Sequence, residues 1–202
     1  MGGEDWELWI EELMKRDLLA QGFITTNYTY IGSEVTWPIY NQGTIGRAKE
    51  DLERAARAIS QKSSKKEGAA YLAVMKGLVS QAASAIPGMS VYLSLLFKIM
   101  KDKNLHEGCI EQAYRLFSEE LYSGAKINID QLGRIRLDNY ELLKEVQEYV
   151  SENWSNFNID TMDQIADFEG YRKDFMQIYG FDFENVDYDK EVSPDSEMTL
   201  YP

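Results

Sequence analysis

The order of elements expected between residues 23 and 79 constrains the fold of this chain more than any other feature. Residues 23–31 are rich in Thr, Tyr and Ile, a composition typical of a strand. Apolar residues then recur at helical spacing over residues 44–61, which predicts an amphipathic helix. Residues 69–79 are mostly apolar and predict a buried strand. This alternation of strand, helix and strand predicts an α/β fold.

Helices are expected to dominate the rest of the chain. The segments with helical spacing are residues 5–15, 89–103, 105–122 and 139–154. A last helix is expected to begin at Thr161, with Gly170 interrupting it before residues 171–179. A short strand is possible at residues 134–137, and the acidic tail from Phe181 is expected to form a surface strap. Two strands are too few for a stable sheet, so the chain resembles the second half of an α/β enzyme.

Charge and composition exclude several classes of function. The chain has 202 residues, a net charge of -13 and 44% hydrophobic residues, too apolar for a disordered chain. Its acidity argues against nucleic acid or an anionic membrane as a partner, because phosphate binding requires clustered Lys and Arg. The most apolar run, residues 91–100, is too short for a membrane span and contains Lys98. The first residues lack the features of a signal peptide, and we expect a cytoplasmic protein without membrane contact.

The single cysteine and single histidine leave little material for a metal site. Cys109 has no partner for an intrachain disulfide, which fits a reducing compartment. With His106 as the only histidine, neither a zinc site nor a serine–histidine triad is expected. Cys109 is expected to be a buried, inert thiol on the helix at residues 105–122. A reactive pair of Cys109 and His106, three positions apart, is the alternative.

The segment around Tyr40 and Lys49 carries the chemical content. Trp37 precedes Pro38, which places Tyr40 on a loop, and Thr44 is expected to cap the helix that follows. Lys49 then lies in the second turn of that helix, where its side chain can reach back to the phenol. The ammonium group and the helix N-terminus both favour phenolate, so we expect a lowered pKa for Tyr40 and a proton donor useful near neutral pH.

Two observations place limits on this interpretation. With 13 tyrosines in the chain, a Tyr–Lys pair at any one spacing is expected by chance, so the spacing alone does not identify a site. The sequence also contains no glycine-rich phosphate loop of either common type. Small and polar residues do follow the expected strand at residues 80–84, however, and ligands of open α/β sheets bind beyond the carboxyl ends of strands.

Several longer motifs resemble one family. They are MGGEDW at 1–6, YIGSEVTWPIY at 30–40, GTIGRAKEDL at 43–52, SAIP at 84–87, YLSLLFK at 92–98, HEGCIEQ at 106–112, GRIR at 133–136, GYRKDF at 170–175, GF at 180–181 and VDY at 186–188. These motifs are similar to those of the bacterial NADH-dependent trans-2-enoyl-CoA reductases, a group also described as a class of enoyl-[acyl-carrier-protein] reductase. The resemblance covers essentially the whole chain.

The resemblance implies a fold and roles for individual residues. The fold would be the C-terminal part of an enlarged Rossmann fold, related to the short-chain dehydrogenases and rich in helix. Tyr40 and Lys49 stand at the ends of the family's Tyr-x8-Lys motif, with Tyr40 as proton donor and Lys49 contacting the nicotinamide ribose of NADH. Tyr30 would contact substrate, and Leu78, Val79 and Ser80 would line the cofactor site. The substrate would be a trans-2-enoyl thioester of coenzyme A or acyl carrier protein.

The chain departs from the family in one large respect. The relatives carry their glycine-rich NAD loop in an N-terminal half that is absent here, so residues 1–202 are expected to be the C-terminal catalytic and substrate-binding half. That missing half is the expected partner, and the complete enzyme is expected to be a monomer. Two other interpretations stay open: a non-catalytic acidic helical module, and a short-chain dehydrogenase acting on carbonyl groups.

Overall fold

A three-stranded parallel sheet forms the centre of the computed structural model, which describes residues 2–40 and 42–193. The strands lie in the order β1 (Ile24–Thr29), β2 (Ala69–Val74) and β3 (Arg134–Arg136). Ile24 of β1 is paired with Ala69 of β2, and Leu72 of β2 is paired with Arg134 of β3. The predicted α/β class is confirmed, and the segment noted as a possible strand completes the sheet.

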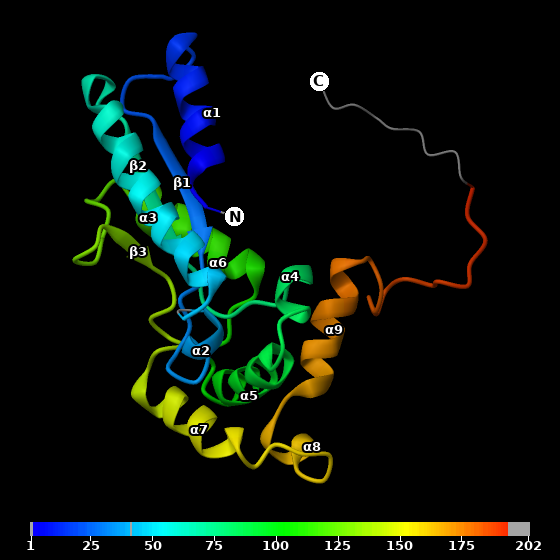
Figure 1. The fold of residues 1–202 in the computed structure, drawn as a ribbon. Helices are drawn as coiled ribbons and strands as arrows, with labels where there is room; N and C mark the ends of the chain where they lie inside the picture. The colour runs from blue at the N-terminus through cyan, green and yellow to red at the C-terminus, as the bar shows by residue number, and fades with distance from the viewer. Residues whose placement is uncertain (1, 41, 194–202) are drawn as a thin grey trace.

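Two helices cover one face of this sheet. Helix α1 (Glu4–Lys15) and the long helix α3 (Thr44–Lys62) run beside each other along it (Figure 1). They pack over the side chains of β2 that point to this face, in a cluster made of Trp6, Ile10, Leu52, Ala55, Ala56, Ile59, Ala70 and Leu72. The Trp6 indole also donates a hydrogen bond of 3.0 Å to the Thr25 hydroxyl of β1, which fixes α1 against the edge of the sheet.

The opposite face is covered by helix α6 (Cys109–Arg115) and by the π-helical segment Leu116–Leu121 that continues it. Leu116 is fully buried and packs with Ala73 of β2 and Ile135 of β3. Alternate residues of β2 therefore serve two different cores, as expected for a strand covered on both sides.

The remaining helices gather beyond the carboxyl ends of the strands (Figure 1). They are α2 (Trp37–Tyr40), α4 (Gln81–Ser84), α5 (Met89–Asp102), α7 (Lys144–Trp154), α8 (Met162–Ile165) and α9 (Phe168–Ile178). Helix α5 lies at the centre of this group and contacts both α7 and α9. Its side chains from Tyr92 to Phe97 are all buried, so it is a core helix rather than an amphipathic surface helix.

Several expected boundaries were wrong. Strand β2 ends at Val74 rather than residue 79, because its ladder with β3 ends where Val74 pairs with Arg136. The helix expected from residue 105 begins only at Cys109. The helix expected from residue 139 begins at Lys144.

Three local expectations around glycines and caps were also wrong. Tyr40 is the last residue of the short helix α2 rather than a loop residue. Gly43 is the N-cap of α3, and Thr44 is its first helical residue. Gly170 does not interrupt a helix but lies inside α9, where its N–H donates to the Asp167 carboxylate that caps this helix.

The last described segment, residues 179–193, contains no helix or strand. It is held locally by Tyr188, whose hydroxyl donates to the Gly180 carbonyl over 2.9 Å and accepts from the Phe183 N–H over 3.0 Å. The rest of the strap expected from the sequence, including Pro194, lies outside the described residues. Within the described ranges, no helix combines the length and apolar character that crossing a bilayer requires.

Candidate functional site

The connections that follow the three strands converge at one edge of the sheet. Tyr30 follows β1, Lys76 and Gly77 follow β2, and Glu141 lies in the connection from β3 to α7. Because all three strands are parallel, their carboxyl ends point the same way, and residues far apart in sequence are brought together there. This edge is where open α/β sheets bind ligands.

The structure brings Tyr40, Lys49 and Tyr30 together at this edge. The Lys49 Nζ atom lies 4.6 Å from the centroid of the Tyr40 ring and 5.6 Å from that of the Tyr30 ring. The two rings meet edge to face, with centroids 4.9 Å apart and planes at 87°. Each residue comes from a different element: Tyr30 from the end of β1, Tyr40 from α2 and Lys49 from the second turn of α3.

The protonation of Tyr40 differs from the sequence prediction. Burial, together with the negative charge of Glu141, raises the pKa of Tyr40 to about 12, so the prediction of a lowered pKa was wrong. Tyr40 is only 6% exposed, and loss of hydration disfavours the phenolate. Burial also lowers the pKa of Lys49 to about 8, which weakens the cation expected to oppose this effect.

Glu141 is a fully buried carboxylate at the centre of a hydrogen-bond network. Its Oε1 atom accepts from the Tyr30 hydroxyl over 2.8 Å and from the Tyr92 hydroxyl of α5 over 2.6 Å. Its Oε2 atom accepts from the Gly77 N–H over 2.5 Å. Burial raises the pKa of Glu141, while these three donors and the nearby Lys76 act in the opposite direction.

Leu78, Val79 and Ser80 lie on the connection between β2 and α4. Val79 is buried, and Ser80 is the N-cap of α4, where its Oγ atom accepts from the Ala83 N–H over 3.1 Å. The segment therefore lies just beyond the carboxyl end of β2. The roles assigned to these three residues, and to Tyr30, Tyr40 and Lys49, stay predictions.

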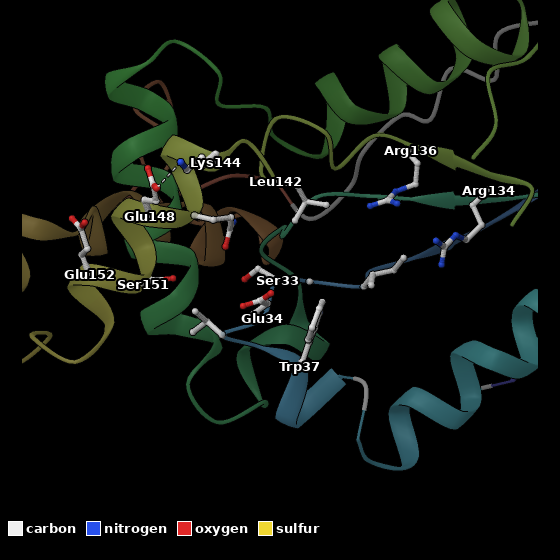
Figure 2. A pocket seen from close by; sticks show the side chains of 14 residues that line it. Ser33, Glu34, Trp37, Arg134, Arg136, Leu142, Lys144, Glu148, Ser151 and Glu152 are labelled. Atoms are coloured by element: carbon white, nitrogen blue, oxygen red, sulfur yellow. Dashed lines mark ion pairs between the residues drawn. The ribbon is translucent and has the colours of Figure 1, made fainter. Parts of the chain in front are cut away.

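A cavity of about 630 Å³ opens between the end of β1, strand β3 and helix α7. Figure 2 shows Arg134 and Arg136 of β3 on one side, Trp37 of α2 below, and the Lys144–Glu148 ion pair of α7 on the other side. Tyr30, Tyr40 and Lys49 are not among its lining residues. The convergence of side chains described above, rather than this cavity, therefore defines the candidate site.

Cys109 and His106 do not form the reactive pair considered above. Cys109 is exposed at the start of α6, so the expectation of a buried thiol was wrong. His106 precedes the helix and packs edge-on against Phe97, with ring centroids 4.5 Å apart. Burial and the cations Lys76 and Lys101 lower the pKa of His106 to about 4. In the part of the chain that the structure describes, no group of three or more metal-ligating side chains is found.

Sequence reasoning did not identify Glu141 and Tyr92 as residues of the site. Glu141 stands in a segment expected to be helical, and Tyr92 is one apolar position of a core helix. The only signal available was the place of Glu141 a few residues after a possible strand. A polar residue in that position can reach the carboxyl edge of a sheet.

A parallel sheet with a tyrosine and a lysine meeting beyond its carboxyl edge defines a Rossmann-like α/β protein. The family model described as "Trans-2-enoyl-CoA reductase catalytic region" matches residues 1–122, and one described as "Enoyl reductase FAD binding domain" matches residues 129–192. The chain belongs to the trans-2-enoyl-CoA reductase family. The resemblance seen in its motifs is thereby confirmed.

Named relatives agree with this membership. The enoyl-[acyl-carrier-protein] reductase [NADH] of Saccharophagus degradans is 48% identical, over 99% of this chain and 50% of its own length. The trans-2-enoyl-CoA reductase [NADH] of Ruminiclostridium cellulolyticum is 48% identical, over 95% of this chain and 48% of its own. The crystal structure of Treponema denticola trans-2-enoyl-CoA reductase in complex with NAD gives a TM-score of 0.89 at 45% identity, covering 95% of this chain and 48% of that one. The chain spans about half the length of the curated relatives it matches.

Proposed function

We propose that this chain supplies the catalytic and substrate-facing part of an NADH-dependent reductase of trans-2-enoyl thioesters. The observation that carries the proposal is the meeting of Lys49, Tyr40 and Tyr30 at the carboxyl edge of the sheet. The names of the relatives support the reaction, and they include both coenzyme A and acyl carrier protein thioesters. The carrier is therefore left open between these two.

The residues at the edge of the sheet fit a nicotinamide cofactor. When bound, NADH would supply the hydride that adds to the β-carbon of the unsaturated thioester. The Lys49 amine is of the right kind to bind ribose hydroxyls, and Leu78, Val79 and Ser80 lie just beyond the carboxyl end of β2. We assign cofactor contacts to these four residues.

Tyr40 is assigned as the proton donor. With a pKa of about 12 it is fully protonated at neutral pH, so it can donate a hydrogen bond to the thioester oxygen as negative charge develops there. Lys49 is charged below a pH of about 8, and its ammonium group beside the Tyr40 ring favours that developing charge. The Tyr30 hydroxyl is bound to Glu141, so Tyr30 is assigned a contact with substrate through its ring.

The proposal includes a partner segment. We propose that residues 1–202 are the C-terminal half of the enzyme and that a glycine-rich NAD-binding half, of the kind expected from the resemblance, completes it as a monomer. The relatives support this, since about half of their length lies outside the match. A cytoplasmic location is part of the same proposal.

The test is a reduction assay with crotonyl-CoA and NADH, on this chain alone and joined to the NAD-binding half of a relative. We expect the joined protein to be active and the chain alone to be nearly inactive. Tyr40→Phe should lower kcat on the order of a hundredfold or more with little change in Tm, whereas Tyr114→Phe, at a tyrosine that is 72% exposed, should change neither. Activity on a ketoacyl thioester but not on the enoyl thioester would overturn the proposal.

A further inference from the structure

The Glu141 carboxylate joins the ends of all three strands to the core helix α5. Its donors are the Tyr30 hydroxyl after β1, the Gly77 N–H after β2 and the Tyr92 hydroxyl of α5, at 2.8, 2.5 and 2.6 Å. Both oxygens therefore act as acceptors, which is the pattern of an ionised carboxylate. Burying a charge of this kind costs free energy unless its hydrogen bonds are made, so the folded state requires the hydrogen bonds of Glu141.

A second layer of contacts holds the donors in place. The Tyr92 hydroxyl accepts from Ser33 Oγ over 3.1 Å and from Gln147 Nε2 over 3.3 Å, and Gln147 also donates to the Glu141 carbonyl over 2.7 Å. A Cβ atom at Gly77 would lie 2.8 Å from the end of the Leu93 side chain, so a larger residue here would require Leu93 to shift. The carboxylate is thus fixed on every side.

The Tyr30 side chain connects this network to Tyr40. Its hydroxyl is bound to Glu141, and its ring meets the Tyr40 ring edge to face at 4.9 Å. Movement of the Tyr30 hydroxyl would therefore also move the Tyr30 ring, against which the Tyr40 ring packs. Gly32, at a φ of +74°, allows this packing, because a Cβ atom there would lie 2.1 Å from the Thr36 hydroxyl oxygen and 3.2 Å from the Tyr30 ring.

The charge of Glu141 also acts on Tyr40. Burial raises the pKa of Tyr40 first, and Glu141 raises it further. The titratable groups facing these residues are Tyr30 and Lys49 beside Tyr40, and Tyr30, Tyr92 and Lys76 around Glu141. Lys76 is fully buried, and its amine donates to the Gly77 carbonyl over 3.0 Å.

We propose that Glu141 is a positioning residue: by accepting the hydrogen bond of the Tyr30 hydroxyl it holds the Tyr30 ring against Tyr40, and so keeps the Tyr40 hydroxyl where the substrate oxygen can meet it. This inference rests on the proposed function of Tyr40. Glu141 itself does not touch the reacting atoms, because its oxygens are occupied by the Tyr30, Tyr92 and Gly77 donors.

The test compares two variants of the joined protein. Glu141→Gln removes the charge and faces an amide N–H toward one of the three donors, whereas Tyr92→Phe removes one hydrogen bond and keeps the charge. We expect Glu141→Gln to lower kcat and kcat/KM together, on the order of tenfold to a hundredfold, with little change in KM for NADH. Tyr92→Phe should cost clearly less.

A second measurement does not depend on turnover. In protein labelled with ¹³C-tyrosine, the NMR ring signal of Tyr40 at neutral pH, assigned by its loss in Tyr40→Phe, reports the position of the Tyr30 ring, because an aromatic ring shifts the signals of its neighbours. We expect this signal to move in Glu141→Gln, where the Tyr30 hydroxyl loses its charged acceptor, and to change less in Tyr92→Phe, which keeps that hydrogen bond. An unmoved Tyr40 signal in Glu141→Gln, or equal kcat losses in the two variants, would overturn the inference. An inactive wild-type protein would contradict the proposed function instead, and the Tyr40 signal would still show whether Glu141 holds Tyr30 in place.

Discussion

At the scale of single residues, Lys49 sets the expected pH dependence of the reaction. Burial lowers its pKa to about 8, so it is charged below this pH and neutral above it. Tyr40, with a pKa of about 12, stays protonated over the same range. We therefore expect kcat/KM of the joined protein to fall as pH rises through about 8, by about tenfold per unit.

Two variants test whether the decline of kcat/KM above pH 8 is caused by deprotonation of Lys49. Lys49→Arg keeps its charge to much higher pH, so the decline near pH 8 should disappear even if the absolute rate is lower. Burial lowers the pKa of Lys76 to about 8 as well, so Lys76→Met tests this second candidate. Because Lys76 lies near Glu141, only the pH of the decline is compared in this variant, not the absolute rate. If the decline persists in Lys49→Arg and vanishes in Lys76→Met, the titrating group is Lys76, and the assignment to Lys49 is wrong.

His106 is expected to make the fold sensitive to acid. Its pKa is about 4 in the folded state and near 6.5 when unfolded, so between these values the unfolded chain binds more protons. The free energy of unfolding should therefore decrease as pH falls from 6.5 to 4. In His106→Gln, we expect the decrease of Tm between pH 6.5 and 4.5 to be smaller than in the wild type. Thermal melts monitored by circular dichroism will show this, and equal decreases would contradict it.

At the scale of elements, α5 is the helix on which the core beyond the carboxyl ends of the strands depends. Leu96 is fully buried among residues of α5, α7 and α9. Leu96→Ala removes this packing and leaves a cavity, so we expect a loss of about 2–5 kcal/mol in the free energy of unfolding. Urea titration measures it, with Leu8→Ala on α1, at a leucine that is 53% exposed, as the control. A loss below 1 kcal/mol at Leu96 would show that the helix repacks.

The elements that could be predicted from sequence are those whose signal is local. Helices α1, α3 and α5 were expected within a residue or two of their observed ends, because their apolar spacing is regular and glycines or turns bound them. The end of β2 and the start of α7 depend on strand pairing and on the Glu141 network, which involve residues distant in sequence. Gly170 was misjudged because Asp167 caps α9 three residues earlier.

In the candidate site, too, only the features that depend on neighbouring parts of the sequence could be predicted. The approach of Lys49 to Tyr40 follows from their positions about a helix start, and the sequence predicted it. The direction of the Tyr40 pKa did not follow, because it depends on burial and on Glu141, which the fold brings from another part of the chain. Spacing can place two side chains near each other, whereas protonation depends on everything that surrounds them.

At the scale of the whole molecule, β1 presents an edge at which the sheet can be extended. The Phe23 carbonyl accepts from the N–H of Ala69, the first residue of β2, and the Thr29 carbonyl accepts from the N–H of Met75, which follows β2. The backbone groups of the odd-numbered residues of β1 therefore point toward β2. In a parallel ladder the N–H and C=O of one residue point the same way, so those of Ile24, Thr26 and Tyr28 point to the other side. Such an edge is a template for pairing.

We expect the proposed NAD-binding half to pair with this edge, and proline substitutions can test it. Thr26→Pro removes an N–H that faces away from β2, so the Tm of the 202-residue chain should change little while association with the other half, measured by co-purification and by restored crotonyl-CoA reduction, is lost. Asn27→Pro removes an N–H that faces β2 and should instead lower the Tm of the chain itself. Because the two substitutions are adjacent and differ only in the direction of the lost donor, a Thr26→Pro chain that still associates and restores activity would show that β1 is not the joining edge.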